Sequence, residues 1–149
     1  MLLEFRKLKV IWKDDDMFEL QVTATNGRYS GMAEVYDTKE SLLPFADELI
    51  GYPKGKGIIS HSCGEKNNYA FFEMKFYPIG YTGKVGVQIS LEENVATDYR
   101  KEEKDKLTME LIVEPNSIDK FQNELLHLAR HEEGEAILLG IGKYTSNVK

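Results

Sequence analysis

The chain has a single cysteine, Cys63, so no internal disulfide can form. No apolar run approaches the ~18 residues that a membrane helix needs. Positive charge is also scarce: 19 Lys and Arg stand against 25 Asp and Glu, a net charge of −6, whereas nucleic-acid binding requires a basic patch. Charges at Glu4, Arg6, Lys7 and Lys9 interrupt what would be the apolar part of a signal peptide. We therefore expect a cytoplasmic protein that binds neither nucleic acid nor membranes.

Alternating apolar residues are the main structural signal that is present. They recur at every second position in Ala70–Phe76 and again in Val85–Leu91, with Pro78, Gly80 and Gly83 between the two runs. A repeat of two residues is the pleat of a strand with one buried face. The two runs predict an antiparallel pair at the centre of a sheet.

The remaining elements follow from the same two kinds of periodicity. Helical stripes begin at Leu42 and Ile118; we expect the first helix to be capped near Ser41 and the second at Asn116 or Ser117. Further strands are predicted in segments 7–13, 18–24, 28–36, 58–63 and 107–113, with 136–141 as a possible last strand. In the first strand, Leu8, Val10 and Trp12 share the inward phase, and a bulge is expected near Arg6 unless pairing starts later. Gly31 indicates a bulge or a close backbone approach.

These elements predict one α+β domain spanning residues 1–149. We expect a mostly antiparallel sheet of about seven strands with two helices packed on one face. The order is three strands, a helix, four strands, a helix and the possible last strand. Segment 92–106 is expected to be an exposed charged loop, and 143–149 a polar tail.

Metal-binding and catalytic patterns are weak in this sequence. Glu124, His127 and His131 project from neighbouring rows of the second helix, but the Glu that follows the first His in helical zinc motifs is absent. His61 and Cys63 share one strand face and are the other candidates as ligands, or as a base and a nucleophile. A strand cysteine is more often a small buried hydrophobe. We therefore expect no catalytic residues, no metal site and no cofactor.

The order of strands, glycines and helices resembles that of the WapI-like immunity proteins over roughly residues 17–128. The resemblance is carried by Phe18-Glu19-Leu20, Gly31, the helix segment Leu42–Leu49, the strand pair 72–76 and 83–87, the strand Leu107–Val113, and Phe121 and Leu125 in the last helix. It implies a small cytoplasmic protein without its own chemistry that binds and neutralises a partner toxin.

Such a partner, for example a basic nuclease domain, would be attracted by acidic surface patches. The candidate residues for partner binding are Asp14, Asp15, Asp16, Glu92, Glu93, Glu132, Glu133 and Glu135. Two alternatives stay open: a small-ligand-binding protein or enzyme with a pocket between sheet and helices, and a metal-binding module. The sequence leaves the oligomeric state undetermined.

Overall fold

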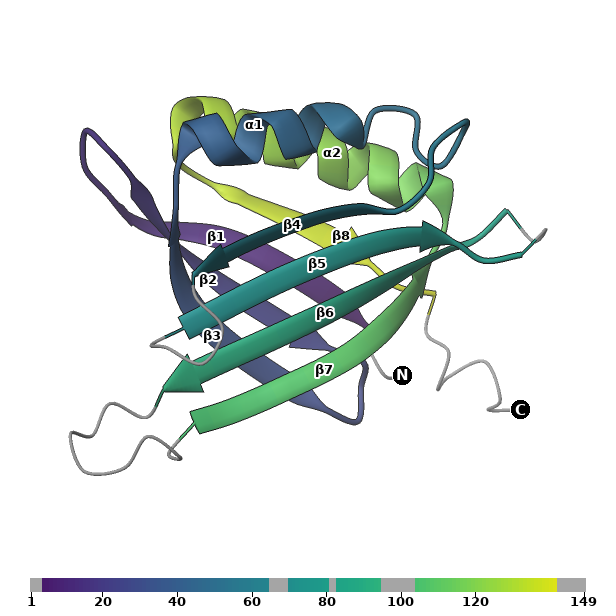
Figure 1. Ribbon diagram of the computed structural model, residues 1–149, viewed down its shortest axis with the longest axis horizontal. Helices are drawn as coiled ribbons and strands as arrows, with labels where there is room; N and C mark the ends of the chain where they lie inside the picture. Colours follow the sequence, from purple (N-terminus) through teal and green to yellow (C-terminus); the bar gives the residue numbers. More distant parts are fainter. Residues whose placement is uncertain (1–3, 65–69, 81–82, 95–103, 142–149) are drawn as a thin grey trace.

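The computed structural model describes residues 4–64, 70–80, 83–94 and 104–141 (Figure 1). Its described residues form eight strands and two helices. The strands are β1 (Phe5–Lys13), β2 (Phe18–Thr25), β3 (Ser30–Asp37), β4 (Ile59–Gly64), β5 (Ala70–Pro78), β6 (Val85–Asn94), β7 (Lys104–Val113) and β8 (Glu135–Leu139), and the helices are α1 (Lys39–Glu48) and α2 (Pro115–His131). The predicted α+β class, with two helices and antiparallel strands, is confirmed.

The strands divide into two four-stranded sheets, where the sequence analysis expected one. Sheet A has the order β3-β2-β1-β8, and sheet B has the order β4-β5-β6-β7. The possible last strand forms and pairs with β1 from Phe5↔Leu139 to Lys9↔Glu135. The two inner faces bury their apolar side chains in one hydrophobic cluster. Strand periodicity gives each strand one buried face but does not reveal that two such faces cover each other.

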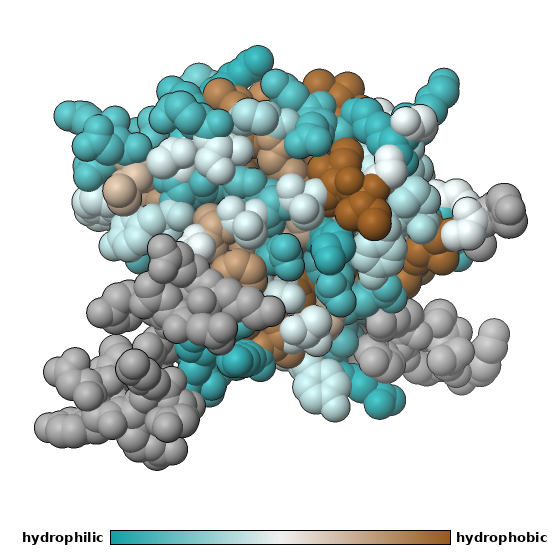
Figure 2. Space-filling model, in the orientation of Figure 1, coloured by the Kyte–Doolittle hydropathy of each residue, from teal (hydrophilic) through white to brown (hydrophobic). Residues whose placement is uncertain are grey.

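The two helices lie side by side along one side of the sheets, near β4 and β8 (Figure 1). Phe45 of α1 and Phe121 and Leu125 of α2 are among the side chains that join the core cluster. Among the described residues, no helix is both long and apolar enough to cross a membrane. Figure 2 shows the side on which sheet B lies, where hydrophilic side chains predominate around a compact hydrophobic group to the right of centre.

The expected bulge in β1 is present but lies at a different place. It falls between Val10 and Trp12 and not near Arg6. Arg6 therefore keeps the phase of Leu8 and points into the core with no exposed surface, whereas Trp12 turns outward and is 47% exposed. The prediction that Trp12 shares the inward face was wrong, because the extra residue reverses the alternation.

Both helices begin earlier than predicted. Thr38 caps α1 in place of Ser41, and its Oγ1 accepts a hydrogen bond from the Ser41 N–H at 3.2 Å. Pro115 occupies the first turn of α2, where N–H groups have no acceptor within the helix, so the N–H that proline lacks is not needed. The helix therefore starts before Asn116.

The predicted loop 92–106 is strand at both of its ends. β6 continues to Asn94 and β7 begins at Lys104, with Glu92 opposite Lys106 and Asn94 opposite Lys104. The Lys104 Nζ lies 3.5 Å from the Glu92 Oε1, so two of the opposite charges that suggested a loop form an ion pair across the two strands. Residues 95–103 of this segment and the predicted tail 143–149 lie outside the described residues.

Candidate functional site

Large apolar side chains gather on the outer face of sheet A. Trp12, Met32 and Tyr36 are 47%, 51% and 54% exposed. The rings of Trp12 and Tyr36 meet edge to face with centroids 6.1 Å apart. Met32 and Tyr36 share the outer phase of β3, and Trp12 is brought beside Tyr36 because Glu19 of β2 pairs with both Trp12 and Tyr36. The β1 bulge therefore creates an exposed aromatic pair.

Carboxylates from three strands lie within and beside this face. Glu19 and Glu34 are half-buried on β2 and β3, and Glu93 of β6 reaches across, its Oε1 accepting a hydrogen bond from the Glu34 N–H at 3.1 Å. Partial burial, and then the charge of Glu34, raise the pKa of Glu19. Partial burial also raises the pKa of Glu93; the hydrogen bond from the Glu34 N–H opposes this rise, and the charges of Glu34 and Glu19 add to it. We name Trp12, Met32, Tyr36, Glu19, Glu34 and Glu93 the acidic–aromatic face.

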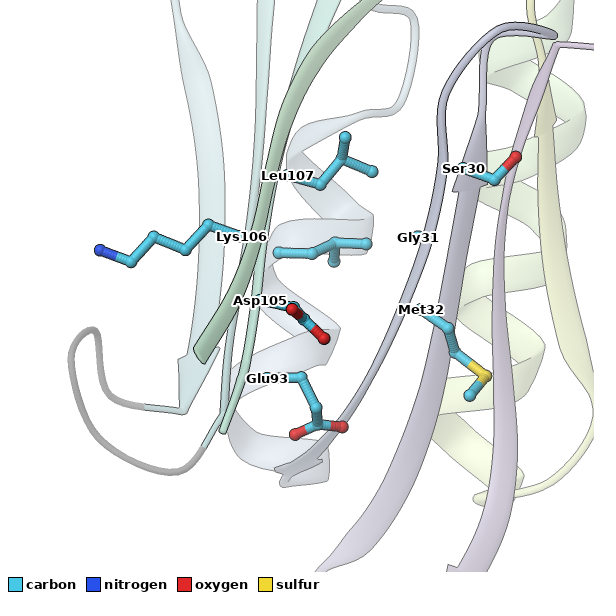
Figure 3. A pocket seen from close by; sticks show the side chains of 8 residues that line it. Ser30, Gly31, Met32, Glu93, Asp105, Lys106 and Leu107 are labelled. Atoms are coloured by element: carbon cyan, nitrogen blue, oxygen red, sulfur yellow. The ribbon is translucent and has the colours of Figure 1, made fainter. Parts of the chain in front are cut away.

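A groove of about 290 Å³ adjoins the acidic–aromatic face, between the edge strand β3 and strands β6 and β7. Figure 3 shows Glu93, Asp105 and Leu107 extending from sheet B toward β3, while Lys106 points to the opposite side of β7. Glu93 and Asp105 are directly opposed in the β6–β7 pair, and like charges in that arrangement destabilise a sheet. The groove therefore presents negative charge to whatever enters it.

Gly31 sets the width of this groove. A Cβ at this position would lie 2.7 Å from the Leu107 Cδ2, which is too close for an ordinary contact. The β2–β3 register shows no bulge at Gly31, and the close neighbours of this glycine are the side chains of Leu107 and Leu91. A side chain here would overlap the Leu107 Cδ2, which would have to move.

The three carboxylates at Asp14, Asp15 and Asp16 lie exposed in the turn between β1 and β2, as the sequence predicts. The Asp14 Oδ1 accepts hydrogen bonds from the N–H groups of Asp16 and Met17 at 2.8 and 2.9 Å, which lower the pKa of Asp14. The turn directly follows Trp12 and Lys13. These charges therefore lie at the aromatic end of the acidic–aromatic face.

The candidate residues Glu132 and Glu133 lie between α2 and β8, and Glu135 is the first residue of β8. Glu132 and Glu135 are each 4.0 Å from a lysine, Lys39 and Lys7 respectively, and Glu133 is exposed. The segment approaches the end of β1, where the Val10 N–H donates to the Gly134 oxygen at 3.0 Å. Two of the predicted acidic segments are thus brought to the same end of sheet A.

The structure separates Glu92 from its neighbour Glu93. The side chain of Glu92 is 5% exposed and lies on the outer side of sheet B, beside Lys104 and Lys106. Its carboxylate is therefore not part of an open acidic patch. Glu93, one residue later, points to the groove and belongs to the acidic–aromatic face.

Glu124, His127 and His131 do not converge as ligands. The Glu124 Oε1 accepts a hydrogen bond from the Ile137 N–H at 2.9 Å and so ties α2 to β8. The two exposed histidine rings lie against each other with centroids 4.4 Å apart. Among the described residues, these three do not form a group of ligand atoms close enough to share a metal ion.

A different polar group is buried where β3 meets α1. One ligand atom each of Asp37, His61 and Cys63 lies within 4.8 Å of the other two, and the residues are 5%, 8% and 8% exposed. The His61 Nε2 lies 2.8 Å from the Asp37 Oδ2, and the Asp37 Oδ1 accepts a hydrogen bond from the Thr38 N–H at 2.7 Å. The ring of Phe45 stacks on His61 at 5.0 Å.

This arrangement does not suit the base-and-nucleophile chemistry considered for His61 and Cys63. Burial, and then the charge of Asp37 and a hydrogen bond to it, raise the pKa of the Cys63 thiol. Thiol chemistry requires the thiolate, which a raised pKa disfavours. None of the three described hollows is lined by these residues.

Sequence reasoning missed Asp37 and, apart from Glu93, the residues of the acidic–aromatic face. Asp37 lies 24 residues before His61 in the sequence, and only the packing of β3 against β4 brings the two side chains together. Trp12 was placed inside because alternation does not reveal a bulge. Glu19 and Glu34 are isolated charges between apolar residues, and only the pairing of β2 with β3 brings them together.

No family model, curated protein or solved structure matches this chain. The resemblance to the WapI-like immunity proteins therefore stays a prediction.

Proposed function

We propose that this chain is a non-enzymatic cytoplasmic immunity protein that binds a basic toxin domain through the acidic–aromatic face and the adjoining groove. The observation that carries the proposal is the exposed Trp12–Tyr36 pair set among half-buried carboxylates. Exposed tryptophan and tyrosine are enriched among the residues that dominate protein-binding energies.

Charge supports a basic partner. The ion pairs among the described residues do not include Glu19, Glu34, Glu93 or Asp105. Lys or Arg side chains of a partner would relieve the repulsion between these carboxylates, and a guanidinium could also stack on the rings of Trp12 or Tyr36. The net charge of −6 would accelerate the encounter with a basic protein.

The experiment measures binding to the toxin domain encoded beside this chain's gene by isothermal titration calorimetry. Trp12→Ala combined with Tyr36→Ala should weaken binding by about 10- to 100-fold, because truncated anchors typically cost about 1–3 kcal/mol. Ile58→Ala is the matched control, since Ile58 is 69% exposed and precedes β4 of sheet B.

The charge requirement is tested with Glu34→Lys, which should weaken binding and remove most of its salt dependence. Asp47→Lys makes the same charge change at an exposed position of α1 and should leave binding nearly unchanged. Failure of the wild-type chain to bind the adjacent toxin at micromolar concentration would overturn the immunity function. Binding that survives both face variants would overturn the assignment of the surface.

A further inference from the structure

We propose that Asp37, His61 and Cys63 form a binding site for a divalent transition metal, with Zn²⁺ as the expected ion. The site is independent of the acidic–aromatic face and of the proposed partner. It departs from the expectation drawn from the sequence, which was that no metal site is present; of the weak candidate ligands named there, it uses His61 and Cys63 and not the three residues on α2.

The chemistry of the three groups suits zinc. A thiolate, an imidazole and a carboxylate are the three ligand types that proteins use for this ion. Burial keeps the Cys63 thiol protonated in the metal-free chain, but a thiol that coordinates Zn²⁺ loses its proton to solvent. The thiolate and the aspartate then carry two negative charges, so the complex with Zn²⁺ would be neutral and compatible with burial. The same set fits a hard ion such as Mg²⁺ poorly, because two of its three ligands are nitrogen and sulfur.

The geometry requires small movements. With zinc–ligand distances near 2.0–2.3 Å, tetrahedral ligand atoms lie about 3.3–3.6 Å apart. The His61 Nε2 and the Asp37 Oδ2 are now 2.8 Å apart and would separate by roughly 0.5 Å to admit the ion. The remaining ligand-to-ligand distances are all within 4.8 Å, so the three groups are already close to the spacing that a shared ion requires.

Surrounding groups already hold the ligands in place. The Thr38 N–H fixes one oxygen of Asp37 and leaves the other directed at His61. Phe45 stacks on the imidazole and restricts its rotation. Such outer contacts orient ligands in known metal sites. Among the described residues the group offers three ligands, so a water molecule would complete the tetrahedron.

The position in the fold suggests a structural role. Asp37 ends β3 of sheet A, whereas His61 and Cys63 lie on β4 of sheet B. A bound ion would therefore link the two sheets at the start of α1. Metal that binds the folded chain more tightly than the unfolded chain raises stability.

The test uses the full chain, freed of metal by chelator dialysis and titrated with Co²⁺ and then Zn²⁺. We expect one ion per chain, a near-ultraviolet thiolate-to-cobalt absorption band that Zn²⁺ removes, and a higher thermal midpoint with Zn²⁺. Cys63→Ser should abolish the band and weaken Co²⁺ binding by at least about tenfold, the low end of the loss seen even for outer groups of metal sites. Cys63→Ala is a second variant that preserves apolar packing if serine disturbs the fold.

The double variant His127→Ala with His131→Ala is the matched control, because these exposed histidines are the competing site on α2. It should keep the absorption band and the stoichiometry. Loss of binding in this control, or a wild-type chain that shows no charge-transfer band and no change of thermal midpoint with Zn²⁺, would overturn the proposal.

Discussion

Replacing Arg6 by methionine is expected to stabilise the fold. Arg6 is fully buried on the inner face of β1, between Ala24 of β2 and Leu138 of β8, which are also fully buried. Its Nε and both terminal nitrogens have no hydrogen-bond partner among the described residues. A buried charge without partners opposes folding, whereas a methionine of similar length fills much of the same space.

The magnitude follows from the pKa of the guanidinium. Burial lowers the pKa of Arg6 to about 9, well below the usual value of a guanidinium, with an opposing contribution from Tyr77. At about 1.4 kcal/mol per pH unit, holding the charge in the folded state at pH 7 costs up to roughly 5 kcal/mol. Replacements of buried charges by apolar residues typically gain about 1–4 kcal/mol, so we expect a gain within that range for Arg6→Met.

Urea unfolding at several pH values tests this reasoning. Because the folded-state pKa is lowered, the penalty is fully present below about pH 9 and falls as the pH rises above 9 toward the usual pKa of arginine. The advantage of Arg6→Met over the wild-type chain should therefore be constant from pH 6 to 8 and about 2 kcal/mol smaller near pH 10.5. A loss of stability in the variant at pH 7 would refute the reasoning, because it would mean that the guanidinium is satisfied in the folded chain.

Two further variants test the electrostatics and the packing of the sheets. Glu93→Gln keeps an oxygen that can accept the hydrogen bond from β3 and should stabilise the chain by up to about 1 kcal/mol at pH 7. Because the pKa of Glu93 is raised in the folded chain, the stability gained by Glu93→Gln should disappear near pH 4, where the carboxyl group is protonated. Unfolding curves at pH 7 and pH 4 test this, and an equal gain at both pH values would show that the charge of Glu93 is not the cause. Gly86→Ala adds a Cβ that would overlap the Tyr77 ring, whose hydroxyl donates a hydrogen bond to Glu110. We expect this variant to lower the free energy of unfolding by about 1–3 kcal/mol, measured by thermal unfolding. A neutral result would show that the ring moves freely.

Much of the fold could be predicted because its signals are local. The alternation in Phe18–Ala24 and Ala70–Phe76 follows from burial on one face and appears directly as strands. The stripe of Ile118, Phe121 and Leu125 likewise marks the buried side of α2. These patterns need no knowledge of what lies across the interface.

The division into two sheets and the candidate site could not be predicted in this way, because both depend on pairing between distant segments. β8 pairs with β1 although the two strands lie near opposite ends of the sequence, and the residues of neither strand indicate which strand it pairs with. The bulge before Trp12 reverses the inward–outward alternation of β1 at this point. The single tryptophan of the sequence therefore faces the surface and not the core. The charges in segment 92–106 suggested a loop because the pairing of Glu92 with Lys104 becomes visible only in space.

Oxidative footprinting with hydroxyl radicals tests the central claim most directly, because Trp12, Met32 and Tyr36 are reactive side chains that are about half exposed in the free chain. In complex with the proposed partner, a toxin domain encoded beside the gene, we expect oxidation of these three residues to fall strongly. Oxidation of Ile58, which is 69% exposed ahead of sheet B, should stay unchanged. A complex in which Ile58 is protected and Trp12, Met32 and Tyr36 react as in the free chain would contradict the account.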